Sequence, residues 1–245
     1  DCAVASAGLM RAAIVEAVHH ARSRTVFGSK LVDQPLMTRV LADMAVDAAA
    51  ATALSMRLAH AFDHAHESEL ESAWARAMTP VVKYWICKAA PPMIGEAMEC
   101  LGGNGYTEDF ALARHYREAP VNSIWEGSGN VMALDLLRVF KRTPELYDTV
   151  LQDISRHLGR RASGTRDVLN AAFDLARSDP GAARIVIEQL ALAAAASELY
   201  RMGATGLADA FAETRLGGAW RSSYGMLDGR FDAAQLLEAL YPPDN

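Results

Sequence analysis

The strongest constraint on the fold is the spacing of apolar residues after Pro35. From there to residue 62, apolar side chains recur every three or four positions, which is the period of one face of an α-helix. Proline is well tolerated in the first turn of a helix, so Pro35 marks its start. The pattern predicts one long helix that packs along a single face. The stripe consists of Leu36, Val40, Met44, Ala48, Ala51, Ser55, Leu58 and Phe62.

The composition favours an all-α fold. Hydrophobic side chains make up 51% of the 245 residues, which is enough to bury a sizeable core. Aromatic residues are only 7%, and the β-branched runs that mark a sheet protein are missing. A chain of this length suits one large domain or two modest ones. It opens at Asp1 without an initiating methionine, and we expect it to be part of a longer protein.

Capping residues predict a helix on each side of the long one. Cys2–Ser23 is compatible with a helix throughout, with Asp1 as its N-cap and a break at residues 26–28. A third helix begins at Ser68 and Glu71, which have the spacing of a capping box.

Prolines divide the rest of that third helix. Pro80 is predicted to kink it, and the pair Pro91-Pro92 to force a restart, because proline lacks an N–H donor and clashes with the preceding turn. The restarted helix covers residues 93–101 and ends at a glycine pair. Residues 104–128 then read as loop.

The connection Thr143-Pro144 is the best candidate for a boundary between two units. A helix over 131–141 precedes it, so we divide the chain into a bundle at 1–142 and a helical extension at 143–245. The extension contains further helical segments joined by short stretches of Gly, Ser and Pro. They span Glu145–Arg161, Arg166–Arg177, Ala182–Met202, Gly206–Leu216 and Asp232–Leu240.

Charge, cysteine content and hydropathy argue against several classes of protein. The 24 basic and 30 acidic side chains give a net charge of −6 with no strongly basic half, so general nucleic-acid affinity is not expected. Cys2, Cys87 and Cys100 form no C-x-x-C pair, which predicts reduced thiols and a cytoplasmic setting. No apolar run approaches membrane-spanning length, and no membrane contact is expected.

Two segments rich in motif residues lie at helix ends. The stretch from Arg24 to Gln34 joins two strong helices, and from spacing alone it is better explained as the closure of a helical hairpin than as a ligand site. The glycines at 102–105 suggest a dinucleotide fingerprint, but no strand precedes them and Glu108 stands at the third glycine position. The Rossmann interpretation is therefore rejected.

The segment Ile124–Asn130 places one carboxylate, Glu126, beside an aromatic residue and among glycines, directly before a helix. Its simplest interpretation is a helix start, capped by Ser128 or Asn130, with Glu126 near the positive end of the helix dipole. The same carboxylate is available for catalysis, and the two interpretations are compatible.

Two charged groups have structural explanations. The first is typical of surface ion pairs. The second contains three histidines, and it is more typical of a solvated helix end than of a metal site, because no defined acidic third ligand shares the histidine face. No metal site is predicted. The first group is Arg114, Arg117, Arg138, Glu108, Asp109, Glu118 and Asp135, and the second is His60, Asp63, His64, His66 and Glu67.

In order and spacing, these motifs resemble the acyl-CoA dehydrogenase family, firmly over residues 1–142 and loosely beyond. The residues around 96–99 and 121–130 are most similar to its AidB adaptive-response subfamily. The resemblance implies a carboxy-terminal four-helix bundle followed by a helical extension. It rests on Arg24-x-x-Phe27-Gly28-x-x-Leu31-x-x-Gln34, Gly102-Gly103-Asn104-Gly105-Tyr106, Arg114 and Trp125-Glu126-Gly127-Ser128.

The resemblance also implies FAD as the cofactor. Arg24, Phe27 and Gln34 would contact the FAD of a neighbouring subunit, with Arg24 near the pyrophosphate, which makes the protein a homo-oligomer. Gly103 would let the backbone approach the adenosine end.

Near the flavin itself, Ser128 and Asn130 would replace the commoner Thr and Gln of the family. Glu99 stands where many relatives place a flavin-contacting Gln, which is a departure from the family pattern.

Glu126 takes the position of the general base, which would remove the α-proton of an acyl-CoA thioester while the β-hydrogen leaves as hydride to flavin N5. Apolar neighbours such as Trp125 would raise the pKa of the carboxylate toward the working pH. The β-domain and much of the acyl pocket of the family are missing from this sequence, so the isolated chain is expected to be inactive.

Two other functions remain as alternatives. One is a flavoprotein of the adaptive response that binds duplex DNA with little dehydrogenase turnover, through the only local basic cluster of the extension. The other, which we favour over DNA binding, is an extension that completes an oligomer interface with the apolar side of Ala182–Met202. The basic cluster is Arg156, Arg160, Arg161 and Arg166.

Overall fold

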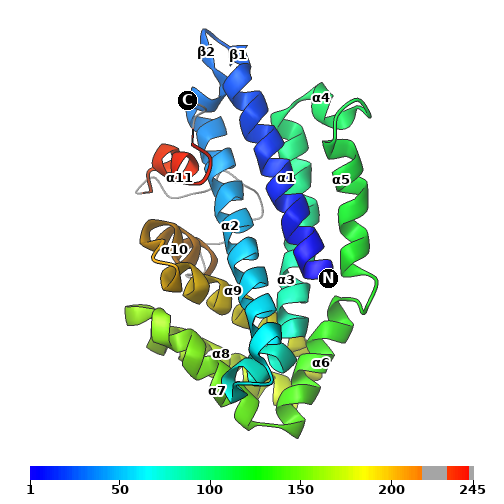
Figure 1. Ribbon diagram of the computed structural model, residues 1–245, viewed down its shortest axis with the longest axis vertical. Coiled ribbons are helices and arrows are strands. Elements are labelled where there is room, and N and C mark those ends of the chain that lie inside the picture. Colours follow the sequence, from blue (N-terminus) through cyan, green and yellow to red (C-terminus); the bar gives the residue numbers. More distant parts are fainter. Residues whose placement is uncertain (217–230, 243–245) are drawn as a thin grey trace.

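The computed structural model describes residues 1–216 and 231–242, and their fold is helical, as predicted (Figure 1). The first unit is a bundle of long helices. Its helices α1 (Cys2–Ser23), α2 (Pro35–His64) and α3 (Glu69–Cys100) pack against one another. The fourth column is formed by α5 (Leu112–Glu118), the 3₁₀ turn η2 (Ala119–Ser123) and α6 (Gly129–Arg142), which pack along α3.

The predicted break after α1 is a tight reversal of the chain. Two short strands, β1 (Thr25–Val26) and β2 (Ser29–Lys30), pair in an antiparallel hairpin, and η1 (Leu31–Asp33) leads into α2. Phe27 and Gly28 form its tip with φ of 49° and 85°, so the turn needs the left-handed backbone that glycine adopts most easily. This hairpin stands at one end of the bundle (Figure 1).

The long helix α2 differs from its prediction in how it is packed. Residues 41–48 are buried around the whole circumference of the helix, because α1, α3, α9 and α11 surround it. Leu36 and Phe62, at the two ends of the predicted stripe, are exposed. The prediction of packing along one face was therefore wrong for the middle of the helix, which lies in the centre of the molecule.

The predicted restart at Pro91-Pro92 was also wrong, because α3 continues through all three of its prolines to Cys100. Each proline removes a backbone donor, but Met93 and Ile94 just beyond the pair are fully buried in the core. Side-chain burial thus holds the helix where local preference would end it. The helix start was predicted correctly, since the Ser68 hydroxyl accepts from the backbone N–H of Glu71 at 3.4 Å.

The segment 104–128 is only partly the predicted loop. It contains α4 (Gly103–Tyr106), α5 and η2. Leu112 and Ala113 of α5 are buried against the bundle, which gives this short segment the apolar contacts that stabilise a helix.

The predicted connection Thr143-Pro144 lies between α6, which ends at Arg142, and α7, which begins at Glu145. The predicted helix to residue 161 ends at His157. The last predicted helix has Asp232 as its N-cap residue, whose side chain accepts from the N–H of Gln235. The elements are α7 (Glu145–His157), η3 (Gly159–Arg161), α8 (Ala162–Ser178), η4 (Pro180–Ala182), α9 (Ala183–Arg201), α10 (Thr205–Phe211), the π-turn η5 (Ala212–Leu216) and α11 (Ala233–Leu240).

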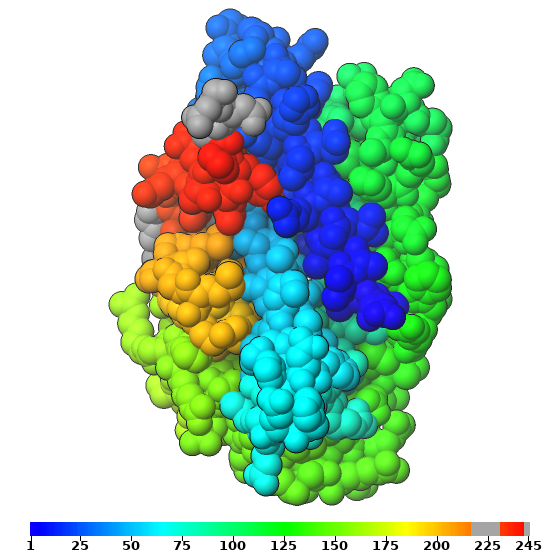
Figure 2. Space-filling view, in the orientation of Figure 1, coloured from blue at the N-terminus to red at the C-terminus, as the bar shows by residue number. Residues whose placement is uncertain are grey.

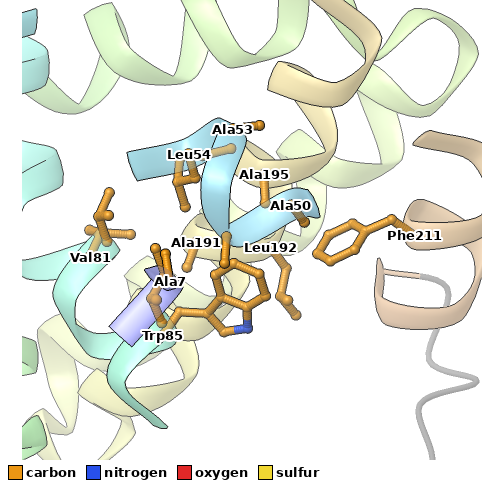
Figure 3. Packing of buried hydrophobic residues seen from close by; sticks show 14 of the residues in the cluster. Ala7, Ala50, Ala53, Leu54, Val81, Trp85, Ala191, Leu192, Ala195 and Phe211 are labelled. Carbon is orange, nitrogen blue, oxygen red and sulfur yellow. The ribbon is translucent and has the colours of Figure 1, made fainter. Parts of the chain in front are cut away.

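Helix α9 joins the extension to the bundle. Its small side chains at 193–196 are fully buried, and α2, α3 and α6 pack against it. Trp85 of α3 lies against Leu192 and meets Phe211 edge to face, with ring centroids 5.8 Å apart (Figure 3). The apolar side of α9 is thus covered inside the chain, and the prediction that it forms an oligomer interface was wrong.

Two buried arginines also cross the junction. Arg57 of α2 is 4% exposed and lies 4.1 Å above the ring of Trp74. It is surrounded by carboxylates from α3, α7 and α9. The distances are 2.5 Å to Glu71, 3.5 Å to Asp153 and 3.7 Å to Glu198.

Arg215 of η5 is the second buried arginine. It reaches Asp43 and Asp47 of α2 at 2.7 and 3.0 Å. The space-filling view shows the orange and red parts of the extension in close contact with the bundle (Figure 2). The division at residue 142 remains a prediction about folding units.

Helix α1 corrects one further expectation. Among the described residues it alone is long and apolar enough to span a bilayer, with a mean hydropathy of 1.3 over its best window. The prediction that no run approaches this length overlooked its many alanines. Half of that window is buried within the protein, where α1 packs against α2 and α3.

Candidate functional site

Glu126 stands at the turn between η2 and α6, at the end of the bundle where α1 begins. Its side chain is exposed, and its backbone is left-handed with φ of 56°. Gly127 follows with φ of 107°, and a Cβ there would come within 2.7 Å of Met132 Cε. The backbone of Gly127 therefore favours glycine. Glu126 also has a left-handed backbone, which is strained for a residue with a side chain.

A buried lysine is hydrogen-bonded to the backbone of this turn. Lys83 of α3 is 7% exposed, and its ammonium donates to the carbonyl of Trp125 at 2.9 Å and to the carbonyl of Gly127. These two carbonyls belong to the residues on either side of Glu126. Motif reasoning missed Lys83, although a lysine inside the apolar run 80–87 was a visible signal.

Within residues 1–216 and 231–242, the side chain of Glu126 has one hydrogen-bond partner. The thiol of Cys2, at the start of α1, donates to Glu126 Oε2 at 3.1 Å. Burial, together with this hydrogen bond, raises the pKa of the Cys2 thiol, so the proton stays on sulfur. All three cysteines are free thiols, as predicted.

Ser128 and Asn130 lie beside Glu126 at the start of α6. Ser128 is the N-cap residue by backbone conformation, but its side chain makes no capping hydrogen bond. Asn130 is exposed, and its Oδ1 accepts from Arg184 Nε of α9 at 2.8 Å. The prediction that one of these two side chains caps the helix was therefore wrong.

The residues of the first motif lie at the opposite end of α1. Phe27 is 101% exposed at the hairpin tip, and Arg24 beside it is exposed as well. Gln34 is half-buried, and its amide donates to Ser29 Oγ at 2.6 Å and to the carbonyl of Val26. Gln34 therefore braces the hairpin that presents Phe27.

Gly103 also lies at the hairpin end of the bundle, in α4 (Figure 1). A Cβ on Gly103 would meet nothing within 4 Å, so packing within the chain does not require glycine there. Gly105 differs, because a Cβ would come within 2.2 Å of the Met98 carbonyl. In this motif Gly105 serves the fold, and Gly103 leaves an open approach to the backbone.

The structure thus separates the predicted site residues into two groups. Glu126, Ser128 and Asn130 form one group, and Arg24, Phe27, Gln34 and Gly103 form the other. Helix α1 has 22 residues, which at about 1.5 Å per residue makes it roughly 33 Å long. The two groups within one copy of the chain are therefore far apart.

The other charged groups are partly confirmed as ion pairs. Arg117 pairs with Glu108 at 2.5 Å, and Arg138 with Asp135 at 3.3 Å. In the histidine group, His64 Nδ1 lies 2.9 Å from Glu67 on the protein surface. In the part of the chain that the structure describes, no three His, Cys, Asp or Glu side chains are arranged to hold a metal ion.

The fold and its two ends define a helical bundle with a carboxylate presented at one end and an uncovered aromatic hairpin at the other. The family described as "Acyl-CoA dehydrogenase, C-terminal domain" matches residues 1–140. The chain belongs to the acyl-CoA dehydrogenase family and corresponds to its carboxy-terminal part, as the motifs predicted.

Curated relatives extend the match. The AidB protein of Escherichia coli (strain K12) is 40% identical over 216 residues, which is 88% of this chain and 40% of that protein. Acyl-CoA dehydrogenase family member 11 of Caenorhabditis elegans is 43% identical over 141 residues, 56% of this chain and 23% of the relative. The chain thus spans less than half the length of these relatives. The AidB match is longer than residues 1–142, so the similarity includes the extension.

Solved structures agree with the fold. The crystal structure of Caenorhabditis elegans ACDH-11 in complex with C11-CoA has a TM-score of 0.75 and 26% identity, covering 97% of this chain and 44% of that one. An acyl-CoA dehydrogenase from Bacillus anthracis complexed with FAD has a TM-score of 0.57 at 18% identity, covers 98% of this chain and 44% of that one, and shows the shared fold.

Proposed function

We propose that this chain is the carboxy-terminal helical part of an FAD-dependent enzyme that introduces an α,β double bond into an acyl-CoA thioester, with Glu126 as the general base. The observation that carries the proposal is the presentation of Glu126. An exposed carboxylate stands on a left-handed turn whose two flanking carbonyls are anchored by a buried lysine. Strained, over-determined backbone of this kind clusters at active sites.

The chemistry asked of Glu126 is the removal of a proton from carbon. An α-C–H is a weak acid, so the base must be ionised, close to the carbon and fixed in direction. The Cys2 thiol donates to one carboxylate oxygen and leaves the other free of this contact. Trp125, half-exposed beside it, supplies apolar surface that would exclude water once an acyl chain is bound.

The residues present fit an FAD that other parts of the protein complete. When bound, FAD supplies the acceptor for the hydride that leaves the β-carbon. Phe27 offers a fully exposed ring, and Gly103 offers open backbone, which suits the approach of a flat or extended cofactor. Ser128 and Asn130 would border the flavin next to Glu126, and Arg24 would meet its pyrophosphate.

The length of α1 supports a shared cofactor. One FAD cannot readily serve both groups of residues in the same copy, because α1 separates them by roughly 33 Å. We therefore propose a homo-oligomer in which Arg24, Phe27 and Gln34 contact the FAD whose flavin lies near Glu126 of a neighbouring subunit.

Substitution of the base tests this function. In the full-length protein, Glu126→Gln keeps the shape of the side chain and removes the proton acceptor, so flavin reduction by acyl-CoA under anaerobic conditions should slow by at least about 100-fold. Glu118→Gln, which changes an exposed carboxylate of α5, is the control and should leave the rate unchanged. A Glu126→Gln protein that reduces its flavin at the wild-type rate would exclude Glu126 as the base.

Binding of duplex DNA has less support. Of the four arginines in the basic cluster, Arg161 is held by Asp209 and Glu213 at 3.1 and 2.7 Å, and Arg156 pairs with Asp153 at 3.4 Å. Cations that already have carboxylate partners release less free energy on a phosphate backbone. The dehydrogenase activity is accordingly the function that the geometry supports best.

A further inference from the structure

We propose that Lys83 is a positioning residue for the base, holding Glu126 in its working conformation through the backbone. This inference rests on the proposed function, because it gives Lys83 a task only if Glu126 removes a proton. The starting point is that the Lys83 ammonium donates to the carbonyls of both Trp125 and Gly127. These hydrogen bonds fix the two ends of a three-residue segment with Glu126 at its centre.

The surroundings of Lys83 show that its charge serves this turn. The side chain is 7% exposed, and among the described residues no carboxylate lies within ion-pairing distance of its ammonium. A buried cation without a counter-ion is costly and is retained only where strong hydrogen bonds compensate. The buried arginines Arg57 and Arg215, by contrast, are each surrounded by carboxylates.

Anchoring both carbonyls determines where the carboxylate points. The carbonyl of Trp125 lies in the peptide plane that precedes Glu126, and the carbonyl of Gly127 lies in the plane that follows Gly127. With both planes anchored to one ammonium, the segment between them has little freedom to rotate, which keeps φ of Glu126 near 56°. The direction of Cα–Cβ is fixed with it, and the Cys2 thiol then orients the carboxylate from the side. A misplacement of about 1 Å at a reacting group can cost about 100-fold in rate, so the two anchors would be felt directly in turnover.

The test compares Lys83→Met with Arg76→Met in the full-length holoenzyme. Arg76 lies on the same helix but is half-exposed and pairs with Asp135 of α6 at 3.2 Å, so its replacement removes a cation from α3 without touching the turn. Per bound flavin, Lys83→Met should lower the limiting rate of flavin reduction by acyl-CoA by about 10- to 100-fold, with KM changed by less than about twofold. Arg76→Met should leave both values unchanged.

A second measurement isolates the base. Exchange of the α-proton of a non-oxidisable acyl-CoA analogue with deuterated water reports proton removal alone, and in Lys83→Met it should slow by the same factor as flavin reduction. A purely structural lysine would lower the melting temperature or the flavin content while the rate per bound flavin stayed at the wild-type value, and that result would overturn the proposal.

Two further variants keep the outcomes distinct. If Lys83→Met fails to fold, Lys83→Gln decides by the same rate per flavin, since an amide can still donate to one carbonyl and should give an intermediate rate. A wild-type rate in Lys83→Gln would count against positioning. If Glu126→Gln abolishes proton exchange and Lys83→Met does not change it, the proposed function stands and the positioning role falls. Exchange that survives in Glu126→Gln would instead refute the proposed function itself.

Discussion

Arg57 and Lys83 are both buried cations, and the protein treats them in opposite ways. Arg57, at the junction of bundle and extension, lies among Glu71, Asp153 and Glu198 and stacks on Trp74. Lys83, at the turn of the candidate site, is held by two neutral carbonyls, and its neighbour Glu126 is exposed and left-handed. Arg57 is thus stabilised by opposite charges, whereas Lys83 is stabilised by hydrogen bonds to backbone carbonyls.

The difference separates what holds the chain together from what acts on a ligand. Removing one partner from a buried group of matched charges leaves the others uncompensated, which is strongly destabilising. A strained turn over a single ammonium adds little to stability, and such strain is tolerated mainly where function requires it. Three expected outcomes would break or sharpen this comparison.

The largest contrast should appear in the isolated chain. Its core and its junction lie within the described residues, so circular dichroism should show high helicity. Its visible spectrum should lack flavin absorbance, because a cofactor site completed by other domains loses most of its contacts when one part stands alone. The full-length protein, purified in parallel, should be yellow. An isolated chain with stoichiometric flavin would show that these helices suffice to hold FAD.

Replacement of Arg57 should have the next largest effect. Arg57→Ala leaves the buried Glu198 and the partly buried Glu71 and Asp153 without their shared cation. It should lower the free energy of unfolding by about 3–5 kcal/mol, measured by chemical denaturation. Arg156→Ala is the matched control. Arg156 contacts the same Asp153 from the surface, at 3.4 Å, and its loss should cost at most about 1 kcal/mol. Equal losses in the two variants would mean that burial of the charges is unimportant here.

The smallest expected effect is a gain in the free energy of unfolding, at the turn of Glu126. Glu126→Gly removes the left-handed strain and should stabilise the chain by about 0.5–1 kcal/mol relative to Glu126→Ala, which keeps φ at 56° without the carboxylate. Both variants lose the hydrogen bond from Cys2, so their difference in unfolding free energy reports the backbone alone. If the alanine variant were the more stable of the two, the turn would not be strained.

Most helices could be predicted from the sequence, because their caps and periodicity are local. The exceptions have tertiary causes. Pro91 and Pro92 do not end α3, since the residues beyond them are buried against other helices. Residues 41–48 are surrounded on all sides by elements such as α9 and α11, which a stripe in one helix cannot reveal.

The candidate site shows the same limit. The motifs pointed to Glu126, but the partners of Lys83 lie 42 and 44 residues further along the chain. Its hydrogen bonds exist only once α3 and the turn are packed together. The separation of the motif residues into two groups was equally hidden, because it depends on where the ends of α1 lie and not on the order of the motifs.

The length of α1 has a consequence for how mutant alleles of this protein behave when they are expressed together. If Phe27 of one subunit contacts the FAD beside Glu126 of its neighbour, a mutation at the hairpin and a mutation at the turn damage different subunits of the same site. A chain with the first mutation still has an intact turn, and a chain with the second still has an intact hairpin. In a cell that makes both chains, some oligomers would contain one of each. In these, the intact hairpin of one subunit would meet the intact turn of the other at one cofactor site. Two inactive alleles would then restore part of the activity together, and the unit on which selection acts would be the assembled pair.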